Sequence, residues 1–412
     1  MHLDSREPRL GGSSVGNSTR QTRPTHGVES HGDSAPPRGA GVSPAGGEAV
    51  SLDNNAKSSR KRTDRWVARG FNWKYSELPR CRKCGRFAVT TDGTVGVRAD
   101  GNSVGYAGLA TCGSVWSCPV CNSRIQNVRR LEIGVALANL HANGGGAGFG
   151  AITVRHNSGQ SLLQTVNVLT YGIARIARDK TVAALRAEMG YIGRVQALEV
   201  THGAHGWHPH RHPLVMFSAP PDPGALAELH LAEFRAFAAG VIRKGYESPL
   251  DLAQVMMPVQ LGSDDVLSDY FTKSSYTAEG AGWELTSSQS KSGRKKTSRT
   301  PWQLLESART TGDMDDLELW NEYELAMKGR RALTFSRGLR DLLGIGKEAT
   351  DEQIAAEEIG DRDDTGFRVM NWEPIGRNAA LGAGLLNAVT PAGNWSAGRE
   401  YAAKHGIEIG EV

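Results

Sequence analysis

Three histidines within five positions are the residues of this 412-residue chain whose spacing most directly suggests chemistry. They are His208, His210 and His212, in the stretch GWHPHRHPLVMF. If this stretch is a strand, alternate side chains share a face, so His210 and His212 point the same way and His208 can join them. Imidazole nitrogens are common metal ligands. The spacing therefore predicts a metal site, and the alternative is a set of exposed histidines on an edge strand.

A carboxylate falls in register with this pair of histidines. The preceding stretch, YIGRVQALEVT, also has the pattern of a strand. A hairpin that is symmetric about Ala204 and His205 places Glu199 directly opposite His210, and directly opposed residues share a face. Glu199, His210 and His212 then form an open-sided, three-ligand set. Such a set suits Mg²⁺ or Mn²⁺, with zinc as a further possibility, and can polarise a phosphate oxygen.

The five cysteines all lie in the first third of the chain. Two CxxC pairs, Cys81 with Cys84 and Cys118 with Cys121, have the pattern of a zinc ribbon, in which each pair donates two thiolates to a tetrahedral Zn²⁺. Cys112, in the stretch CGSVWSC, could replace one of these four. The odd number and the tight clustering favour metal binding in a reducing compartment over disulfides, although buried free thiols are an alternative.

Composition and charge set wide limits on function. The chain is 39% hydrophobic and 22% charged, which is ordinary for a globular protein, and its formal net charge of +4 permits an anionic partner without requiring one. There is no run of 18 apolar residues, and the N-terminal stretch MHLDSREPRLGGSSVG lacks the apolar core of a secretory signal. We therefore expect a cytoplasmic protein with no membrane partner.

Basic residues gather at two places outside the predicted core. Residues 1–62 are rich in Gly, Ser, Pro and Arg and poor in large apolar side chains, so we expect a disordered basic tail. The tail ends in a cluster that includes Arg60, Lys61 and Arg62, and a polar loop, KSGRKK, contains Lys295 and Lys296. We interpret both clusters as contacts to DNA phosphates, with solvated linkers as the alternative.

Hydrophobic periodicity predicts an α+β fold in which helices and strands interleave. The predicted strands are 149–156, 191–201, the histidine stretch and 252–261. One predicted helix begins near residue 123, and the other predicted helices cover 161–179, 223–245, 263–276, 301–329 and 336–343. We expect four parts: the tail, a zinc-ribbon-like segment (63–122), the main domain with a helical extension (123–345) and an acidic, less patterned C-terminal segment (346–412).

Several of these stretches together resemble a known family. AITVRH, EVTHGAHGWHPHRH and DYFTK follow one another along the chain, with CGSVWSCPVC before them and GRRALTFSRGLRDLLG after them. The set is similar to the rolling-circle plasmid replication initiators (Rep proteins) of the HUH endonuclease superfamily, in the branch of Gram-positive and actinobacterial plasmids that carries a cysteine cluster. The resemblance covers about residues 80–345. It implies an HUH-type antiparallel sheet with flanking helices, preceded by the zinc-ribbon-like segment.

The resemblance also implies a reaction and its partners. Members of the family nick one DNA strand with a tyrosine, which forms a 5′-phosphotyrosine and leaves a 3′-OH primer. Tyr270 matches this nucleophile and Lys273 matches the lysine that steadies the phosphate or the phenolate. The two residues are three apart in a predicted helix and so share a face. The implied partners are the plasmid double-strand origin, single-stranded DNA, and the host helicase and polymerase.

Two other functions remain open on the sequence. One is a transposase or relaxase of the same superfamily, although the tyrosine follows the histidines here, as in the initiators. The other is a non-catalytic zinc-ribbon regulator that binds DNA. It is kept open by Arg211, which stands where the family has a bulky apolar residue, and by Pro213, which removes one donor from the strand ladder.

Overall fold

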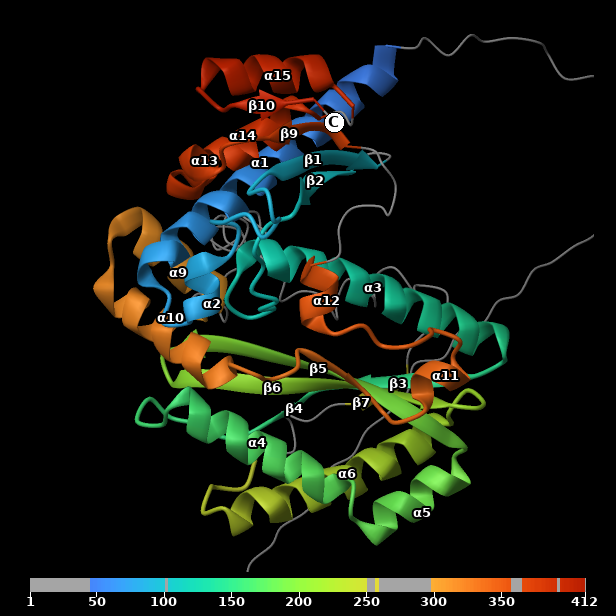
Figure 1. Ribbon diagram of the computed structural model, residues 1–412. Coiled ribbons are helices and arrows are strands. Elements are labelled where there is room, and N and C mark those ends of the chain that lie inside the picture. The colour runs from blue at the N-terminus through green and yellow to red at the C-terminus, as the bar shows by residue number, and fades with distance from the viewer. Residues whose placement is uncertain are drawn as a thin grey trace, which may run out of the picture. The chain divides into compact units, whose positions relative to one another are not determined.

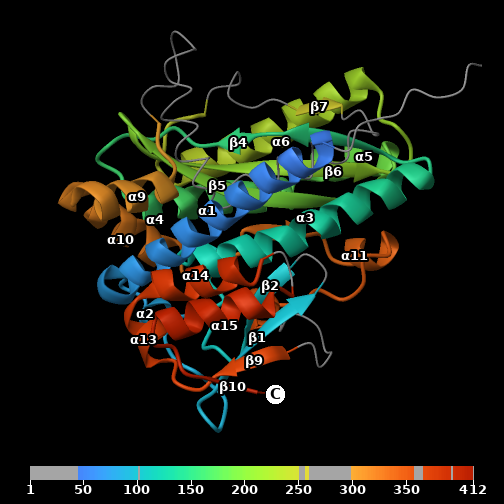
Figure 2. The ribbon, with the colours of Figure 1, turned by 90° about the horizontal axis from the view of Figure 1, so that it is seen from above.

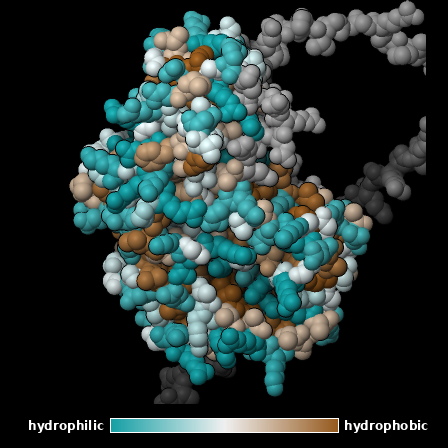
Figure 3. Space-filling model, viewed as in Figure 1, coloured by the Kyte–Doolittle hydropathy of each residue, from teal (hydrophilic) through white to brown (hydrophobic). Residues whose placement is uncertain are grey.

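The computed structural model describes residues 45–100, 103–249, 256–258, 298–356, 365–390 and 393–411. From Ala49 onward the chain forms one compact unit. The unit contains helices and two sheets in which every strand pair of the described residues is antiparallel, which confirms the predicted α+β class. No helix in these ranges is both long enough and apolar enough to cross a membrane. The face seen in Figure 3 is largely hydrophilic, with separate apolar patches.

A six-stranded sheet contains the histidine stretch. Its strands run in the order β7-β3-β6-β5-β8, and β4 also pairs with β6. Their bounds are β3 (Gly146–Gly150), β4 (Ile152–Thr153), β5 (Tyr191–Gly203), β6 (Gly206–Phe217), β7 (Met256–Pro258) and β8 (Leu333–Phe335). The long hairpin of β5 and β6 forms the middle of the sheet (Figure 1). The predicted strands 191–201 and 206–217 are therefore confirmed as β5 and β6. The stretch 149–156 instead holds the end of β3 and the two residues of β4, and only residues 256–258 of the predicted strand 252–261 are described, as β7.

Helices cover both faces of this sheet. On one face, Val195, Ala197 and Leu214 pack in one core cluster with residues of α3 (Pro119–Ala142) and α11 (Leu339–Leu342). The opposite face packs against α4 (Leu162–Ile176) and α6 (Pro223–Arg243), with α5 (Lys180–Glu188) beside them (Figure 1). Each strand therefore presents alternate residues to two different helical layers.

Local sequence explains where these helices begin. Ser161 caps α4 through a capping box with Gln164, and the carboxylate of Asp222 accepts a hydrogen bond from the N–H of Ala225 at the start of α6. The thiol of Cys118 accepts from the N–H of Cys121 at the start of α3. The first turn of α3 is therefore part of the cysteine cluster.

A helical pair and the residues before it hold the turn end of the β5–β6 hairpin. The pair is α9 (Pro301–Thr311) and α10 (Met314–Met327), within the region predicted to be helical. The indole N–H of Trp207 donates to Glu322 of α10 at 2.7 Å. The backbone of His202 exchanges hydrogen bonds of 2.8 and 2.7 Å with the backbone of Arg299. The turn end of the hairpin is thus fixed from two sides.

A second sheet joins the two ends of the described chain, in the strand order β10-β9-β1-β2 (Figures 1 and 2). Its strands are β1 (Val95–Asp100), β2 (Ser103–Ala107), β9 (Thr365–Val369) and β10 (Ile409–Gly410). The helices that pack on this sheet are α1 (Ala45–Tyr75), α13 (Glu373–Arg377), α14 (Ala379–Ala388) and α15 (Trp395–Lys404). Two short helices, α2 (Pro79–Lys83) and α12 (Asp351–Ala356), pack instead in the core cluster of the six-stranded sheet. The segments predicted as 63–122 and 346–412 therefore share one sheet and do not form separate parts.

The structure also corrects the predicted tail. Residues 45–62 are the first part of α1, while residues 1–44 lie outside the described residues. The side chains that anchor this helix, Trp66 and Trp73, come after residue 62 and are buried in the core of the second sheet. The composition of residues 1–62 therefore could not reveal the helix, because the apolar contacts that stabilise it lie further along the chain.

The core of the second sheet gives a test of the joined ends. Phe367 of β9 is fully buried and lies edge-on to Trp395. Phe367→Ala should lower the free energy of unfolding by about 3–5 kcal/mol, because it removes a packed aromatic ring and leaves a cavity. Met370→Ala, at a side chain that is 44% exposed, should change it by less than about 0.5 kcal/mol. Denaturant unfolding measures both, and equal effects would contradict the packing described.

A buried carboxyl predicts a pH-dependent stability. Glu324 of α10 accepts hydrogen bonds from the hydroxyl of Ser76 and the N–H of Glu77, and burial raises its pKa from 4.5 to about 7. The folded protein therefore binds an extra proton between these values, so the stability from this group is present below pH 4.5 and lost as the pH rises through 7. The loss should be on the order of 3 kcal/mol. Glu324→Gln should flatten the dependence in unfolding curves measured from pH 5 to 8, and Glu318→Gln, on the exposed side of α10, should leave it in place.

Candidate functional site

The β5–β6 hairpin brings one carboxylate and two imidazoles together. Glu199 pairs with His210 across the hairpin, and Gly203 pairs with Gly206 at its turn, as the predicted symmetry requires. One oxygen of Glu199, Oε2, lies 3.0 Å from Nε2 of His210 and 3.2 Å from Nε2 of His212. The ligand atoms of the three residues all lie within 4.8 Å of one another. We call Glu199, His210 and His212 the triad.

Contacts behind the two imidazoles orient them. Nδ1 of His212 lies 3.3 Å from the carbonyl oxygen of Gly150, and Nδ1 of His210 lies 3.3 Å from the carbonyl oxygen of His208. The ring of Phe149 stacks on His212 at 5.7 Å. A backbone acceptor at Nδ1 selects the tautomer whose Nε2 carries a lone pair, which is the form that binds a metal. Both Nε2 atoms face Glu199.

The charge of the triad is that of a metal-binding set. Burial would raise the pKa of Glu199, but its close contacts with the imidazoles of His210 and His212 outweigh burial and hold the pKa well below its usual range. Its carboxylate is therefore ionised at neutral pH. Two imidazoles and an ionised carboxylate, with side positions open, fit a divalent metal such as Mg²⁺, Mn²⁺ or Zn²⁺.

His208 belongs to a different pair. Its ring stacks on His156 with 4.8 Å between centroids and 15° between planes. Burial, together with the neighbouring charges of His210 and His156, lowers its pKa from 6.5 to about 4. His208 is thus a neutral imidazole at pH 7 and lies outside the group of possible ligands.

Arg211 and Pro213 do not interrupt the hairpin. Arg211 pairs with Leu198 and Pro213 with Gln196 in an unbroken register. On its other side, β6 pairs with Phe149 through Leu214 and with Ile152 through Arg211, so Pro213 falls where this ladder passes from β3 to β4. Burial, together with the neighbouring charges of Arg194 and Arg330, lowers the pKa of Arg211 to about 10. The missing N–H of Pro213 thus falls at a break between two strands.

The cysteine cluster has a different membership from the one predicted. The thiols within 4.8 Å of one another are those of Cys84, Cys112, Cys118 and Cys121. Sγ of Cys84 lies 3.6 Å from both Cys118 and Cys121, and Cys112 lies 3.7 Å from Cys121. Cys81 is buried in α2 but is not in this group. The geometry therefore favours Cys112 over Cys81 as the fourth ligand, the exchange that the CGSVWSC spacing left open.

The four thiols fit one tetrahedral metal. All are buried, and hydrogen bonds from Cys112, Cys118 and Cys84 hold the pKa of Cys121 well below its usual value. At least one thiolate is therefore favoured within the cluster. Four cysteine sulfurs suit Zn²⁺ in a structural role.

The other predicted site residues form two groups, one outside the described residues and one in α1. Tyr270, Lys273, Lys295 and Lys296 lie outside the described residues. Arg60, Lys61 and Arg62 lie in α1, where Arg62 donates to Asn387 of α14 at 2.6 Å and to Thr390 at 3.1 Å. The guanidinium of Arg62 thus holds α1 to α14. Arg60 is exposed on the same helix.

Two supports of the triad were not predicted. They are the carbonyl of Gly150, which contacts His212, and Glu322, which accepts the indole N–H of Trp207. Trp207 beside the histidines is a signal that some buried acceptor exists, because a buried indole N–H usually has a partner. The sequence contains nothing that selects Glu322 for this role.

The chain is similar to two curated proteins. It is 27% identical over 380 residues to "Protein rep" of Streptomyces lividans, covering 76% of this chain and 81% of that protein. It is 28% identical over 149 residues to "Neomycin resistance protein" of Streptomyces cyanogenus, covering 30% of this chain and 34% of that protein. No protein-family model and no solved structure matches.

The membership of the cysteine cluster can be tested by metal content. We expect the purified protein to carry about one zinc per chain, and Cys112→Ser to carry less than about half, because a serine hydroxyl is a poor substitute for a thiolate ligand. Cys81→Ser should keep its zinc. Elemental analysis after gel filtration measures both. The opposite result would restore the two CxxC pairs as the ligand set.

Proposed function

We propose that this protein is a plasmid replication initiator that nicks one strand of its origin by tyrosine attack. The observation that carries the proposal is the triad, in which Glu199 meets His210 and His212 on one face of an antiparallel hairpin. The similarity to a protein named "Protein rep", over 81% of that protein, supports the same function. Its substrate would be plasmid DNA.

The residues of the triad would hold the catalytic metal. A bound Mg²⁺ or Mn²⁺ would polarise an oxygen of the scissile phosphate. Glu199 would contribute an ionised carboxylate, and His210 and His212 would contribute Nε2 lone pairs whose direction is fixed by the backbone acceptors at Nδ1. The open side of the triad would face the DNA.

Tyr270 and Lys273 would carry out the covalent step. In the proposed reaction the phenol oxygen of Tyr270 loses its proton and attacks phosphorus. The bond from phosphorus to the 3′ oxygen breaks, and this oxygen takes up a proton to become the free 3′-OH. The products are a 5′-phosphotyrosine and a primer end. Lys273 would place its positive charge beside the phosphate or the phenolate.

The remaining expectations follow from this reaction. The cysteine cluster would hold a structural zinc that fixes the start of α3. The 3′-OH end would be extended by a host polymerase behind a host helicase, in the cytoplasm. A transposase or relaxase would use the same chemistry, but the tyrosine follows the histidines along the chain, which favours an initiator. The unbroken pairing through Arg211 and Pro213 argues against a regulator that has lost the site geometry.

Nicking of supercoiled DNA tests the proposal. With Mg²⁺ or Mn²⁺, the protein should convert a supercoiled plasmid that carries its own gene region to the open circular form and become covalently attached to DNA. His210→Ala and His212→Ala should each abolish nicking, because each removes a ligand. Tyr270→Phe should abolish both nicking and the adduct. Lys273→Ala should slow nicking by about 10²–10³. Gel electrophoresis and mass spectrometry of the adduct provide the readouts.

Two control variants make this test specific. His205→Ala changes an exposed histidine of the hairpin turn and should leave nicking intact. Tyr276→Phe removes a second hydroxyl near Tyr270 in the sequence and should also leave it intact. An adduct at Tyr276, or full activity in His210→Ala, would refute the assigned roles.

A further inference from the structure

A cavity of about 590 Å³ lies beside the cysteine cluster, and no part of the proposed reaction uses it. Its apolar wall includes Leu78, Val115, Trp116 and Leu333. Its cationic side chains include Arg80, Lys328 and Arg331. We call this cavity the basic pocket. Its volume is within the range of small-ligand sites, roughly 300–1,000 Å³.

The basic pocket and the triad lie on the same face of the six-stranded sheet. Leu333 of β8 pairs with Ala197 of β5, and Ala197 pairs with His212 of β6. Directly opposed residues in antiparallel strands share a face. Leu333 and His212 are therefore two strand spacings apart on that face, or about 10 Å. A ligand in the pocket would lie next to a ligand at the triad.

The segment that carries two of these cations comes directly before β8 and joins the sheet beside the triad. The N–H of Leu198 donates to the carbonyl of Ala332 at 2.8 Å. The next residue on β5 is Glu199, and the residue before Ala332 is Arg331. The basic segment that contains Lys328 and Arg331 therefore runs along the edge of the strand that bears the triad's carboxylate.

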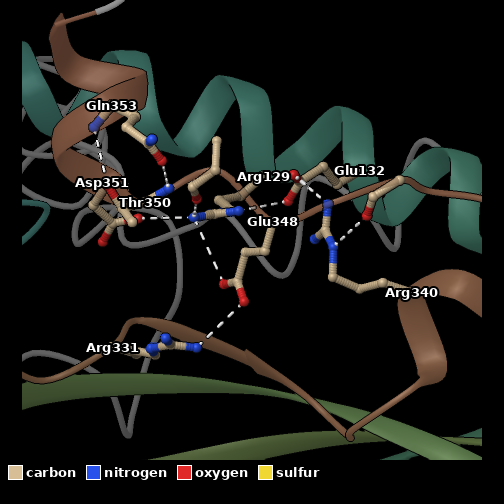
Figure 4. Close-up of polar contacts among 10 residues, drawn as sticks. Arg129, Glu132, Arg331, Arg340, Glu348, Thr350, Asp351 and Gln353 are labelled. Atoms are coloured by element: carbon tan, nitrogen blue, oxygen red, sulfur yellow. Dashed lines mark hydrogen bonds and ion pairs between the residues drawn. The ribbon is translucent and has the colours of Figure 1, made fainter.

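The cations at the pocket differ in how firmly they are held. Arg129 is buried and binds Glu132 at 2.9 Å and Asp351 at 3.0 Å (Figure 4). This network shapes the wall and leaves Arg129 no freedom to bind a ligand. Arg331 is 67% exposed and lies 3.3 Å from Glu348. Exposed pairs of this kind are weak, so Arg331 can exchange its partner for a phosphate.

Lys328 supplies uncompensated positive charge. It is exposed and makes no hydrogen bond or ion pair with the described residues. The carboxylates of Glu348, Asp351 and Glu352 also line the cavity, but each is paired with an arginine: Glu348 with Arg331, Asp351 with Arg129 and Glu352 with Arg80. The pocket therefore attracts an anion.

An apolar cavity bordered by exposed cations matches the two parts of a nucleotide. Phosphates bind the cations, and the base enters the apolar space. A base in a duplex is paired and stacked and cannot enter such a cavity unless it is extruded. We propose that the basic pocket binds single-stranded DNA, namely the segment next to the phosphate held at the triad. This inference rests on the proposed function for the identity of the strand, while the pocket itself is independent of cleavage.

Binding without cleavage tests the pocket. The affinity of the full chain for a labelled single-stranded oligonucleotide is measured by fluorescence anisotropy with no added divalent metal. Lys328→Glu should weaken binding about tenfold and reduce the slope of log affinity against log salt by about 0.7, the value for one lost phosphate contact in single-stranded DNA. Lys404→Glu makes the same charge change at an exposed position of α15 and should stay within twofold of wild type. Melting temperatures of both variants show whether the fold is kept.

The outcomes separate this inference from the proposed function. Equal effects of Lys328→Glu and Lys404→Glu, or an equal loss for a duplex of the same sequence, would overturn the pocket. If Lys328→Glu loses affinity for single strands while the wild-type protein fails to nick its plasmid, the pocket stands and the proposed reaction falls. If nicking occurs and Lys328→Glu binds single strands like wild type, the reaction stands and the pocket falls.

Discussion

The register of the β5–β6 hairpin is the constraint on which the rest of the site depends. Strand side chains alternate with a period of two, so a slip by one residue would turn Glu199 away from His210 and His212. The turn itself fixes the register, because Gly206 has a φ of +83° and a Cβ there would lie 3.0 Å from the backbone of Ser158. The Trp207–Glu322 hydrogen bond and the backbone pairing of His202 with Arg299 then hold the same end of the hairpin.

The face of the sheet that carries the triad has an apolar part and a polar part. Val195 and Leu214 pack with residues from the C-terminal half of α3, such as Leu137, so this helix covers the sheet away from the hairpin turn. The other end of α3 begins at the cysteine cluster, where Cys118 is its N-cap. Cys112, a member of the cluster, also lines the basic pocket. The cluster therefore determines both where α3 begins and one wall of the pocket.

The sequence predicted the parts of this structure that depend on short-range interactions. The pairing of Glu199 with His210 was predictable because the connection is two residues long, and the start of α4 because Ser161 and Gln164 form a capping box. The pairing of Val97 with Phe367 was not, because strand pairing over a long sequence separation leaves no local pattern. The choice of Cys112 over Cys81 depends on distances, which CxxC spacing does not contain.

The short length of β8 explains how a triad inside a sheet can be reached from its edge. β8 pairs with β5 at Val195, Gln196 and Ala197, and the next strand pairing on this edge of β5 within the described residues is the bridge between His202 and Arg299. Neither pairing includes Glu199, so the edge of the sheet next to the triad's carboxylate is left without a neighbouring strand from β8 or from residues 298–300. A longer β8 would extend over this edge and carry the backbone of Arg331 into the sheet. Ending the strand at Leu333 instead leaves Lys328 and Arg331 at the cavity, beside the carboxylate that would bind the metal.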